Sequence, residues 1–235
     1  MIALIHIGKT GGTTLNALLS SNINKYIEYH VTRNYQLNEQ HIVWIRNPIA
    51  RFCSAFNHSY YGVHTHIHDI KEFNLEHCLI PMRMKASINK PYVFSQEYDA
   101  LMKQFTSANH LAESLTSPDK TIQQKAVELM MHHEEHLYKG IHWYLNATHL
   151  NIKFVGRTEF MKEDILKLSK MLNVKLDENL KLRENVYVDS SMKYLSPLAI
   201  QNIIDWYKED YDALKKLAEN GWIDESTLNM YYTYE

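Results

Sequence analysis

The chain opens with Met1-Ile-Ala-Leu-Ile-His-Ile7 and continues directly as Gly8-Lys9-Thr10-Gly11-Gly12-Thr13-Thr14-Leu15. The first stretch is a short apolar run, typical of a buried strand. The second combines glycines, which let backbone N–H groups approach an anion, with a lysine and several hydroxyl groups. A strand that feeds such a loop and then a helix predicts a phosphate-binding turn. In a Walker A loop the lysine follows the last glycine, whereas here Lys9 precedes Gly11 and Gly12.

A second apolar run, His41-Ile-Val-Trp-Ile-Arg46, ends in an arginine. The dipeptide Asn47-Pro48 then suits a helix N-cap followed by the first helical position. Arg46 is therefore predicted at the carboxyl end of a strand, where open α/β sheets bind ligands. Ser54 and His58 are four residues apart on the predicted helix and share one of its faces. An arginine fork together with a serine hydroxyl suits a second phosphate.

Both stretches resemble motifs of the sulfotransferases that use 3′-phosphoadenosine 5′-phosphosulfate (PAPS). Residues 7–15 resemble their 5′-phosphosulfate loop, and residues 45–54 resemble their 3′-phosphate motif, R-[DN]-P-x-x-R-x-x-S. The glycan O-sulfotransferases of the heparan sulfate 6-O and 2-O type have similar loops, K-T-G-[GS]-T. The resemblance implies PAPS as co-substrate and a hydroxyl acceptor, which is expected to be a saccharide, with another small molecule as the open alternative. No metal is expected, because the lysine, the arginine and the backbone amides carry the charge of the anion. The implied cofactor-binding residues are Lys9, Thr10, Gly11, Gly12, Thr13, Thr14, Arg46 and Ser54.

The resemblance also implies a catalytic histidine at the end of a second strand between the two motifs, and His30, in residues 25–32, occupies that place. Histidine has a pKa suited to taking a hydroxyl proton near neutral pH. Lys9 is expected against the bridging oxygen of the leaving phosphate, where positioning and electrostatics stabilise the transferred group. His58 is the substrate-binding candidate, because the 6-O type has an acceptor-contacting histidine four residues after the motif serine. The alternatives are a strand-end histidine that only forms hydrogen bonds for His30, and a solvated helix histidine for His58.

A polar stretch precedes the last predicted helix, and in the family such a stretch closes over the adenosine 3′-phosphate. Ser190, Ser191 and Lys193 are therefore further cofactor-binding candidates, and a loop that only caps the helix is the alternative. Arg51 belongs to the second motif, but its expected role is structural, by salt bridging or packing under the site.

The sequence predicts an α/β fold, a P-loop-like doubly wound parallel sheet flanked by helices, in a single sulfotransferase domain over residues 1–235. A mostly helical insertion is expected over residues 61–150, with a helix start at 117–119. The stretch Asn151–Gly156 predicts a further strand, and its junction F-V-G-x-T-E also resembles the family. One helix is expected to run through Leu172, and a last long helix to begin at Ser196-Pro197 with an apolar stripe as far as Leu214.

The composition fits an intracellular globular enzyme. A chain of 235 residues can bury a sizeable core, and a net charge of −2 gives no sign of a nucleic-acid partner. Two cysteines imply no disulfide framework. No stretch has the length and apolarity of a membrane span, and the first apolar run is too short for a signal peptide, so a cytoplasmic location is expected. The oligomeric state is not readable.

Two other functions are kept open. A P-loop-like small-molecule kinase would use ATP and Mg²⁺, and the position of Lys9 counts against it. The second alternative is a zinc hydrolase, because the stretch 132–136 matches H-x-x-E-H with His132, Glu135 and His136. It would need a third ligand from elsewhere, and a chain with 14 histidines produces such matches by chance. The alternating histidines of 64–68 suit a metal or an anionic acceptor, and residues 58–100 are where acceptor specificity is expected.

Overall fold

The computed structural model describes residues 1–30, 32–64, 95–133, 136–180 and 193–234. The chain forms two compact units, and each is described in turn. The first unit comprises Met1–Arg51, Lys139–Lys181 and Ile203–Glu235, and the second comprises Phe52–Tyr138 and Leu182–Asn202.

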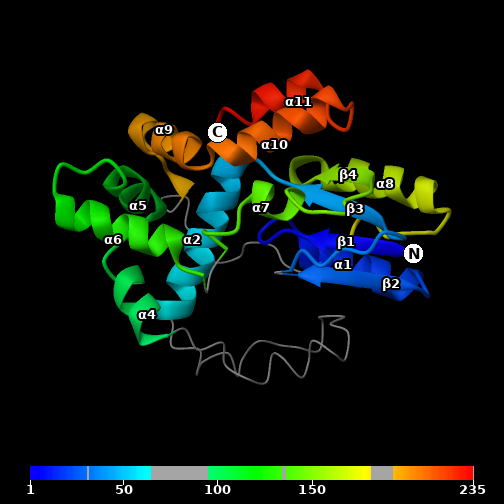
Figure 1. Cartoon of the computed structure of the whole chain (residues 1–235), viewed down its shortest axis with the longest axis horizontal. Helices are drawn as coiled ribbons and strands as arrows, with labels where there is room; N and C mark the ends of the chain where they lie inside the picture. Colours follow the sequence, from blue (N-terminus) through cyan, green and yellow to red (C-terminus); the bar gives the residue numbers. More distant parts are fainter. Residues whose placement is uncertain (31, 65–94, 134–135, 181–192, 235) are drawn as a thin grey trace. The chain divides into compact units, whose positions relative to one another are not determined.

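The first unit is built on a parallel sheet whose described strands run in the order β2-β1-β3-β4 (Figure 1). The strands are β1 (Ile2–His6), β2 (Tyr26–His30), β3 (Gln40–Ile45) and β4 (Ile152–Arg157). The chain passes from β1 to β2 on one side and returns to β3 on the other side of β1. The carboxyl ends of β1 and β3 therefore flank the reversal of strand order, where open α/β sheets bind ligands. The predicted α/β fold, with a parallel sheet flanked by helices, is confirmed.

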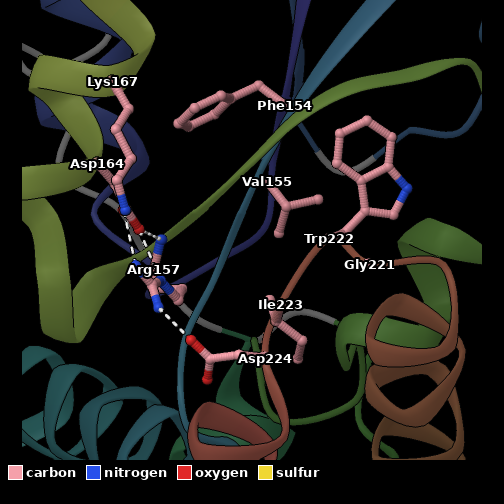
Figure 2. Close-up of a pocket in the computed structure, with 9 residues that line it drawn as sticks. All are labelled: Phe154, Val155, Arg157, Asp164, Lys167, Gly221, Trp222, Ile223 and Asp224. Carbon is pink, nitrogen blue, oxygen red and sulfur yellow. Dashed lines mark hydrogen bonds and ion pairs between the residues drawn. The ribbon is translucent and has the colours of Figure 1, made fainter.

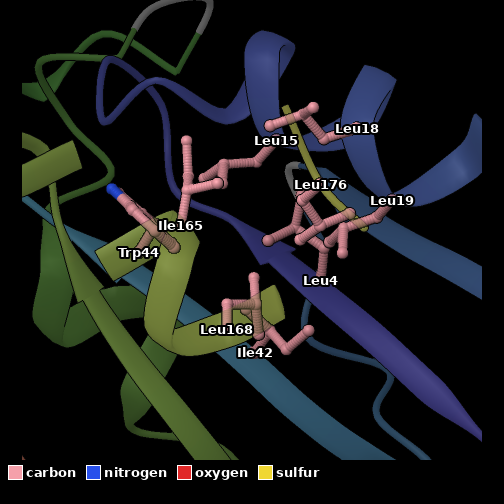
Figure 3. Packing of buried hydrophobic residues seen from close by; sticks show 9 residues of the cluster. All are labelled: Leu4, Leu15, Leu18, Leu19, Ile42, Trp44, Ile165, Leu168 and Leu176. Carbon is pink, nitrogen blue, oxygen red and sulfur yellow. The ribbon is translucent and has the colours of Figure 1, made fainter. Parts of the chain in front are cut away.

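One face of the sheet is covered by α1 (Gly12–Asn22) and by α8 (Met161–Leu172), which follows the 3₁₀ turn η3 (Thr158–Phe160). Apolar side chains of both helices meet those of the central strands (Figure 3). The buried cluster consists of Leu4, Leu15, Leu18, Leu19, Ile42, Trp44, Ile165, Leu168 and Leu176. Gly156 lies against the Trp44 ring, so closely that a Cβ there would overlap the indole. The glycine of the F-V-G-x-T-E junction is therefore required by core packing.

The opposite face carries Tyr29 and His41, whose rings lie beside Tyr35. The Tyr35 hydroxyl donates to the Tyr144 carbonyl (3.0 Å), which links this face to α7 (Ile141–Leu145). Two further helices of this unit are α10 (Lys208–Glu219) and α11 (Glu225–Met230). The α7 helix is held at its start by Asp210 of α10, whose carboxylate accepts two backbone N–H groups at 2.8 Å each.

Arg51 is fully buried at the end of the first unit's N-terminal segment. Its guanidinium lies over the Tyr207 ring at 5.1 Å and donates to the Lys139 carbonyl at 3.3 Å. These contacts agree with the structural role expected for this motif arginine.

The second unit is helical in its described part, which agrees with the predicted insertion. It contains most of α2 (Pro48–His64), α4 (Gln96–Met102), α5 (Ala108–Ser114), α6 (Lys120–Met131) and the start of α9 (Pro197–Trp206). Asp119 caps α6 by accepting from the N–H groups of its first turn, so the predicted start at 117–119 is confirmed. Ser196 ties α9 to α5 through its hydroxyl, which donates to Glu113 at 2.6 Å.

The expectation of one long final helix is wrong. The helix ends at Trp206, and a new helix, α10, begins at Lys208. The interruption falls at Tyr207, whose ring is buried against Arg51. The apolar stripe itself is real, since Ile203, Tyr207 and Leu214 are all buried. A stripe of this period continues across a turn when both helices bury the same kind of face, so periodicity did not reveal the break.

The helix expected to carry the H-x-x-E-H pattern is also not formed. The helix α6 ends at Met131, and His132 has an extended backbone (φ −71°, ψ 126°) with its ring beside Tyr98 at 5.0 Å. His132 and His136 therefore do not share a helix face, and Glu135 lies outside the described residues, as do His66 and His68. Within the described ranges, no group of three or more His, Cys, Asp or Glu side chains is placed to hold a metal ion. None of the helices described there is long and apolar enough to cross a membrane.

Candidate functional site

The loop after β1 has the backbone geometry of an anion-binding turn. Lys9 (φ 70°) and Gly11 (φ 86°) both adopt the left-handed conformation, which turns backbone N–H groups toward one side of a loop. Gly11 is the N-cap of α1, and no side chain of the described residues caps this helix. A helix start without a side-chain cap leaves its first N–H groups to water or to a ligand. The loop therefore offers amide donors, the partial positive charge of α1 and the lysine at one place.

Thr10 helps to shape this loop from within. It is fully buried, and its hydroxyl donates to the Ile7 carbonyl at 2.9 Å. The hydroxyl is therefore used to close the turn, while Thr13 and Thr14 stand half-buried in the first turn of α1.

The loop is braced from β3 and from the junction after β4. Arg46, directly after β3, donates from Nη1 to the Lys9 carbonyl at 3.2 Å. The Thr158 hydroxyl lies 2.8 Å from the Thr10 carbonyl and 3.0 Å from the Ile45 carbonyl. Asn47 caps α2 as predicted, since its Oδ1 accepts from the first N–H groups of that helix. Sequence reasoning did not identify Thr158 as a loop residue, although the F-V-G-x-T-E junction contained it.

His30 is the last residue of β2, as predicted, and its side chain is exposed. Its ring stacks on that of His6, with centroids 4.3 Å apart and planes inclined by 23°. The pKa of His30 is lowered from 6.5 to about 4, mainly by desolvation; the charges of His6 and Lys139 contribute to the decrease, and Glu28 opposes it. The imidazole is therefore neutral at pH 7, which is the form that can accept a proton.

The remaining candidates belong to the second unit and are described within it. Ser54 and His58 both lie on α2, where Ser54 is half-buried and His58 is exposed. The His58 ring lies 6.0 Å from that of His136. Lys193 is exposed before α9, whereas Ser190 and Ser191 lie outside the described residues. In the first unit, three candidate elements thus lie at the edge of the sheet formed by the carboxyl ends of its strands. They are residues 9–14, Arg46 and His30.

A pocket of about 500 Å³ lies elsewhere in the first unit, between β4, α8 and the turn from α10 to α11 (Figure 2). Arg157 lines it and is held by Asp164 through two hydrogen bonds, Nε to Oδ2 at 2.8 Å and Nη2 to Oδ1 at 2.9 Å. The Arg157 Nη1 also donates to Thr227 at 3.0 Å. All three nitrogens of this guanidinium already form hydrogen bonds within the protein, so Arg157 serves to hold β4, α8 and α11 together. None of the predicted site residues lines this pocket.

The sequence was compared with protein families, curated proteins and solved structures. Residues 1–216 match the family model described as the sulfotransferase family, a span that includes the loop, Arg46, His30 and α2. No curated protein and no solved structure matches the chain. The family match covers most of the sequence and agrees with the parallel α/β sheet and its loop. The chain therefore belongs to the sulfotransferase family.

Proposed function

We propose that this protein transfers a sulfuryl group from PAPS to a hydroxyl group, with a saccharide as the acceptor. The observation that carries the proposal is the loop after β1, which lacks a side-chain cap on α1 and meets Arg46 at the reversal of strand order. PAPS carries a sulfuryl group bonded to a phosphate, and the phosphate is a good leaving group. The two units are proposed to form one sulfotransferase domain, since the family match spans both.

The anionic donor fits the residues of the loop. The amides of Gly11 to Thr13, with the hydroxyls of Thr13 and Thr14, are proposed to hold the 5′-phosphosulfate, and Thr10 contributes through the shape that its buried hydroxyl imposes. Lys9 is proposed to lie against the oxygen that joins phosphorus to sulfur. Arg46 is proposed to bind the 3′-phosphate, and the sequence motifs make Ser54, Ser190, Ser191 and Lys193 further candidates for that role. A guanidinium is well suited to this task because it binds phosphate through two parallel hydrogen bonds.

His30 is proposed as the general base. It takes the proton of the acceptor hydroxyl as the new oxygen–sulfur bond forms, and the electron pair of the broken sulfur–oxygen bond leaves with the phosphate. Lys9 stabilises the negative charge that develops on that leaving oxygen. The low pKa of His30 keeps its imidazole neutral in the free protein. Negative charge bound at the neighbouring loop raises a histidine pKa, so His30 becomes a stronger base when the donor is present.

His58 is the proposed acceptor contact. It is exposed on α2, four residues after Ser54, which is the spacing of the 6-O glycan sulfotransferases that the sequence resembles. The saccharide assignment is supported by this spacing and by the K-T-G-G-T-T loop.

The experiment that tests the donor site is calorimetric titration with adenosine 3′,5′-bisphosphate in the presence of EDTA, with ATP and Mg²⁺ as the comparison. We expect the bisphosphate to bind without metal. Lys9→Ala and Arg46→Ala should each weaken it by about 10- to 100-fold, the range for losing a hydrogen bond to a charged group. Lys103→Ala is the matched control, because this lysine is exposed on the other unit and pairs with Asp99. Binding of ATP with Mg²⁺ but not of the bisphosphate would replace the proposal by the kinase alternative.

His30→Ala separates chemistry from binding. With PAPS and a panel of p-nitrophenyl glycosides, turnover should be lost while the affinity for the bisphosphate stays within a few-fold of the wild type. Normal turnover in this variant would show that His30 is not the base.

A further inference from the structure

Three side chains form a connected row at the carboxyl ends of β1 and β2. The strands pair in register, with Leu4 beside Glu28 and His6 beside His30. Because side chains alternate along a strand, Glu28, His6 and His30 lie on the same face of the sheet, which is the face covered by α1. His6 Nδ1 lies 2.5 Å from Glu28 Oε1, and the His6 ring stacks on that of His30 at 4.3 Å.

His6 also lies directly against the loop after β1, residues 7–15, which is proposed to bind the donor phosphate (the phosphate loop). A Cβ placed on Gly12 would overlap the His6 ring at Cγ, Cδ2 and Nε2, the edge turned away from Glu28. Gly12 is the first residue of α1, so the buried His6 ring is clamped between the helix start and Glu28. The same ring therefore contacts the loop that is proposed to bind the donor and the histidine that is proposed as base.

We propose that His6, oriented by the Glu28 carboxylate, is a positioning residue that fixes His30 relative to the phosphate loop. The proposal rests on the function proposed above, in which His30 is the base and the loop binds the donor. A carboxylate at Nδ1 determines which His6 nitrogen carries the proton and prevents the ring from turning over. Fixing the base relative to the donor matters because transfer is efficient only when the reacting groups are held close to their productive positions.

The charges around His30 give this role a signature that simple packing would not produce. Among the described residues, charged and titratable groups that act on its imidazole include His6 from β1, Glu28 from β2 and Lys139 from the segment before α7. Of these, Glu28 favours the protonated form of His30, whereas His6 and Lys139 oppose it. Glu28→Gln should therefore move the titration of His30 to lower pH, and His6→Phe, which keeps a stacked ring, should move it to higher pH.

The test is NMR titration of the His30 imidazole in the full chain labelled at histidine, with His30→Gln to assign its signal. We expect the midpoint of the His30 titration to shift by about 0.5 to 1 pH unit, in opposite directions for the two variants. Glu219→Gln, at the exposed end of α10, is the matched control and should leave the titration unchanged. If His6→Phe fails to fold, Glu28→Gln alone tests the row, because it preserves the hydrogen bond and removes only the charge.

Repeating the titration with saturating adenosine 3′,5′-bisphosphate tests the link to the loop. In the wild type the bound anion should raise the pKa of His30 by about one unit, and in His6→Phe this rise should fall by at least half. A rise of the same size in His6→Phe, or a His30 titration that neither variant changes, would overturn the positioning role and leave the donor site intact. Failure of the wild type to bind the bisphosphate would instead overturn the proposed function, and this inference with it.

Discussion

Removing the Thr158 hydroxyl should loosen the phosphate loop by a predictable amount. In the structure this one donor lies 2.8 Å from the carbonyl of Thr10 and 3.0 Å from the carbonyl of Ile45. Thr158→Val keeps the shape of the side chain and leaves both carbonyls without this partner. A net hydrogen bond contributes about 0.5–1.5 kcal/mol, and an unsatisfied buried acceptor costs about 1–3 kcal/mol. Because Thr158 is half-buried, water can replace part of the loss, and we expect a fall of about 1–2 kcal/mol in the free energy of unfolding.

Part of this loss should reappear in ligand affinity. A loop that must be ordered by the ligand binds it more weakly, and about 1 kcal/mol of ordering corresponds to a Kd roughly five-fold higher. Urea denaturation and calorimetry with adenosine 3′,5′-bisphosphate measure the two effects. The matched control is Thr233→Val, because the exposed Thr233 hydroxyl also donates to a carbonyl, that of Met230 at 2.8 Å, and Thr233 is not part of residues 7–15. Thr158→Val with the expected loss of stability and an unchanged Kd would refute the reasoning that this hydroxyl holds the binding conformation.

Three further outcomes follow from other contacts. Asp164→Ala removes the buried carboxylate that pairs with the Arg157 guanidinium, so the free energy of unfolding measured in urea should fall by about 3–5 kcal/mol. A loss below about 1 kcal/mol would contradict the paired geometry. Folding lowers the pKa of His30 from 6.5 to about 4, so the unfolded chain is protonated at this residue at a higher pH than the folded chain. The free energy of unfolding should therefore decrease as the pH falls from about 6.5 to 4. Urea midpoints across that range should vary less in His30→Gln. Gly12→Ala should lower stability by about 1–3 kcal/mol because its Cβ overlaps the His6 ring, and His6→Ala in the same chain should recover part of it; full additivity of the two changes would show that they do not touch.

The features that sequence reasoning predicted correctly are those written in neighbouring residues. The apolar run before Gly8 predicts β1, and Asn47-Pro48 predicts the start of α2 because a side-chain acceptor and a fixed φ act within one turn. Asp119 predicts the start of α6 for the same reason. The end of α6 at Met131 has no such local signal, and the H-x-x-E-H pattern therefore looked helical when it is not.

The contacts that complete the site depend on strand register and on long-range packing. Thr158 reaches Thr10 across 148 positions of the chain, and His6 meets His30 only because β1 and β2 pair in parallel with those two residues opposite each other. His6 looked like one more residue of an apolar strand. Its neighbour Glu28 gave no sequence signal either, since a carboxylate in a strand is ordinarily exposed.

Two of the loop's threonines, Thr10 and Thr13, distinguish the proposed donor site from a magnesium-dependent kinase. In P-loop enzymes the hydroxyl that follows the lysine binds Mg²⁺. Here that residue is Thr10, which is fully buried and donates its proton to the Ile7 carbonyl. Thr13, by contrast, stands in the first turn of α1, where the amides are left without a side-chain cap. Thr10→Val should therefore reduce stability by about 1 kcal/mol, the net value of one hydrogen bond.

Thr13→Val should show the reverse pattern. Stability should change by less than about 0.5 kcal/mol, whereas the affinity for adenosine 3′,5′-bisphosphate should fall about 10-fold through loss of a hydrogen bond to a charged ligand. Urea denaturation and calorimetry in EDTA measure both variants. If Thr10→Val removed Mg²⁺-dependent nucleotide binding and Thr13→Val did not affect the bisphosphate, the loop would act as a kinase loop, and the reasoning from its hydrogen bonds would be wrong.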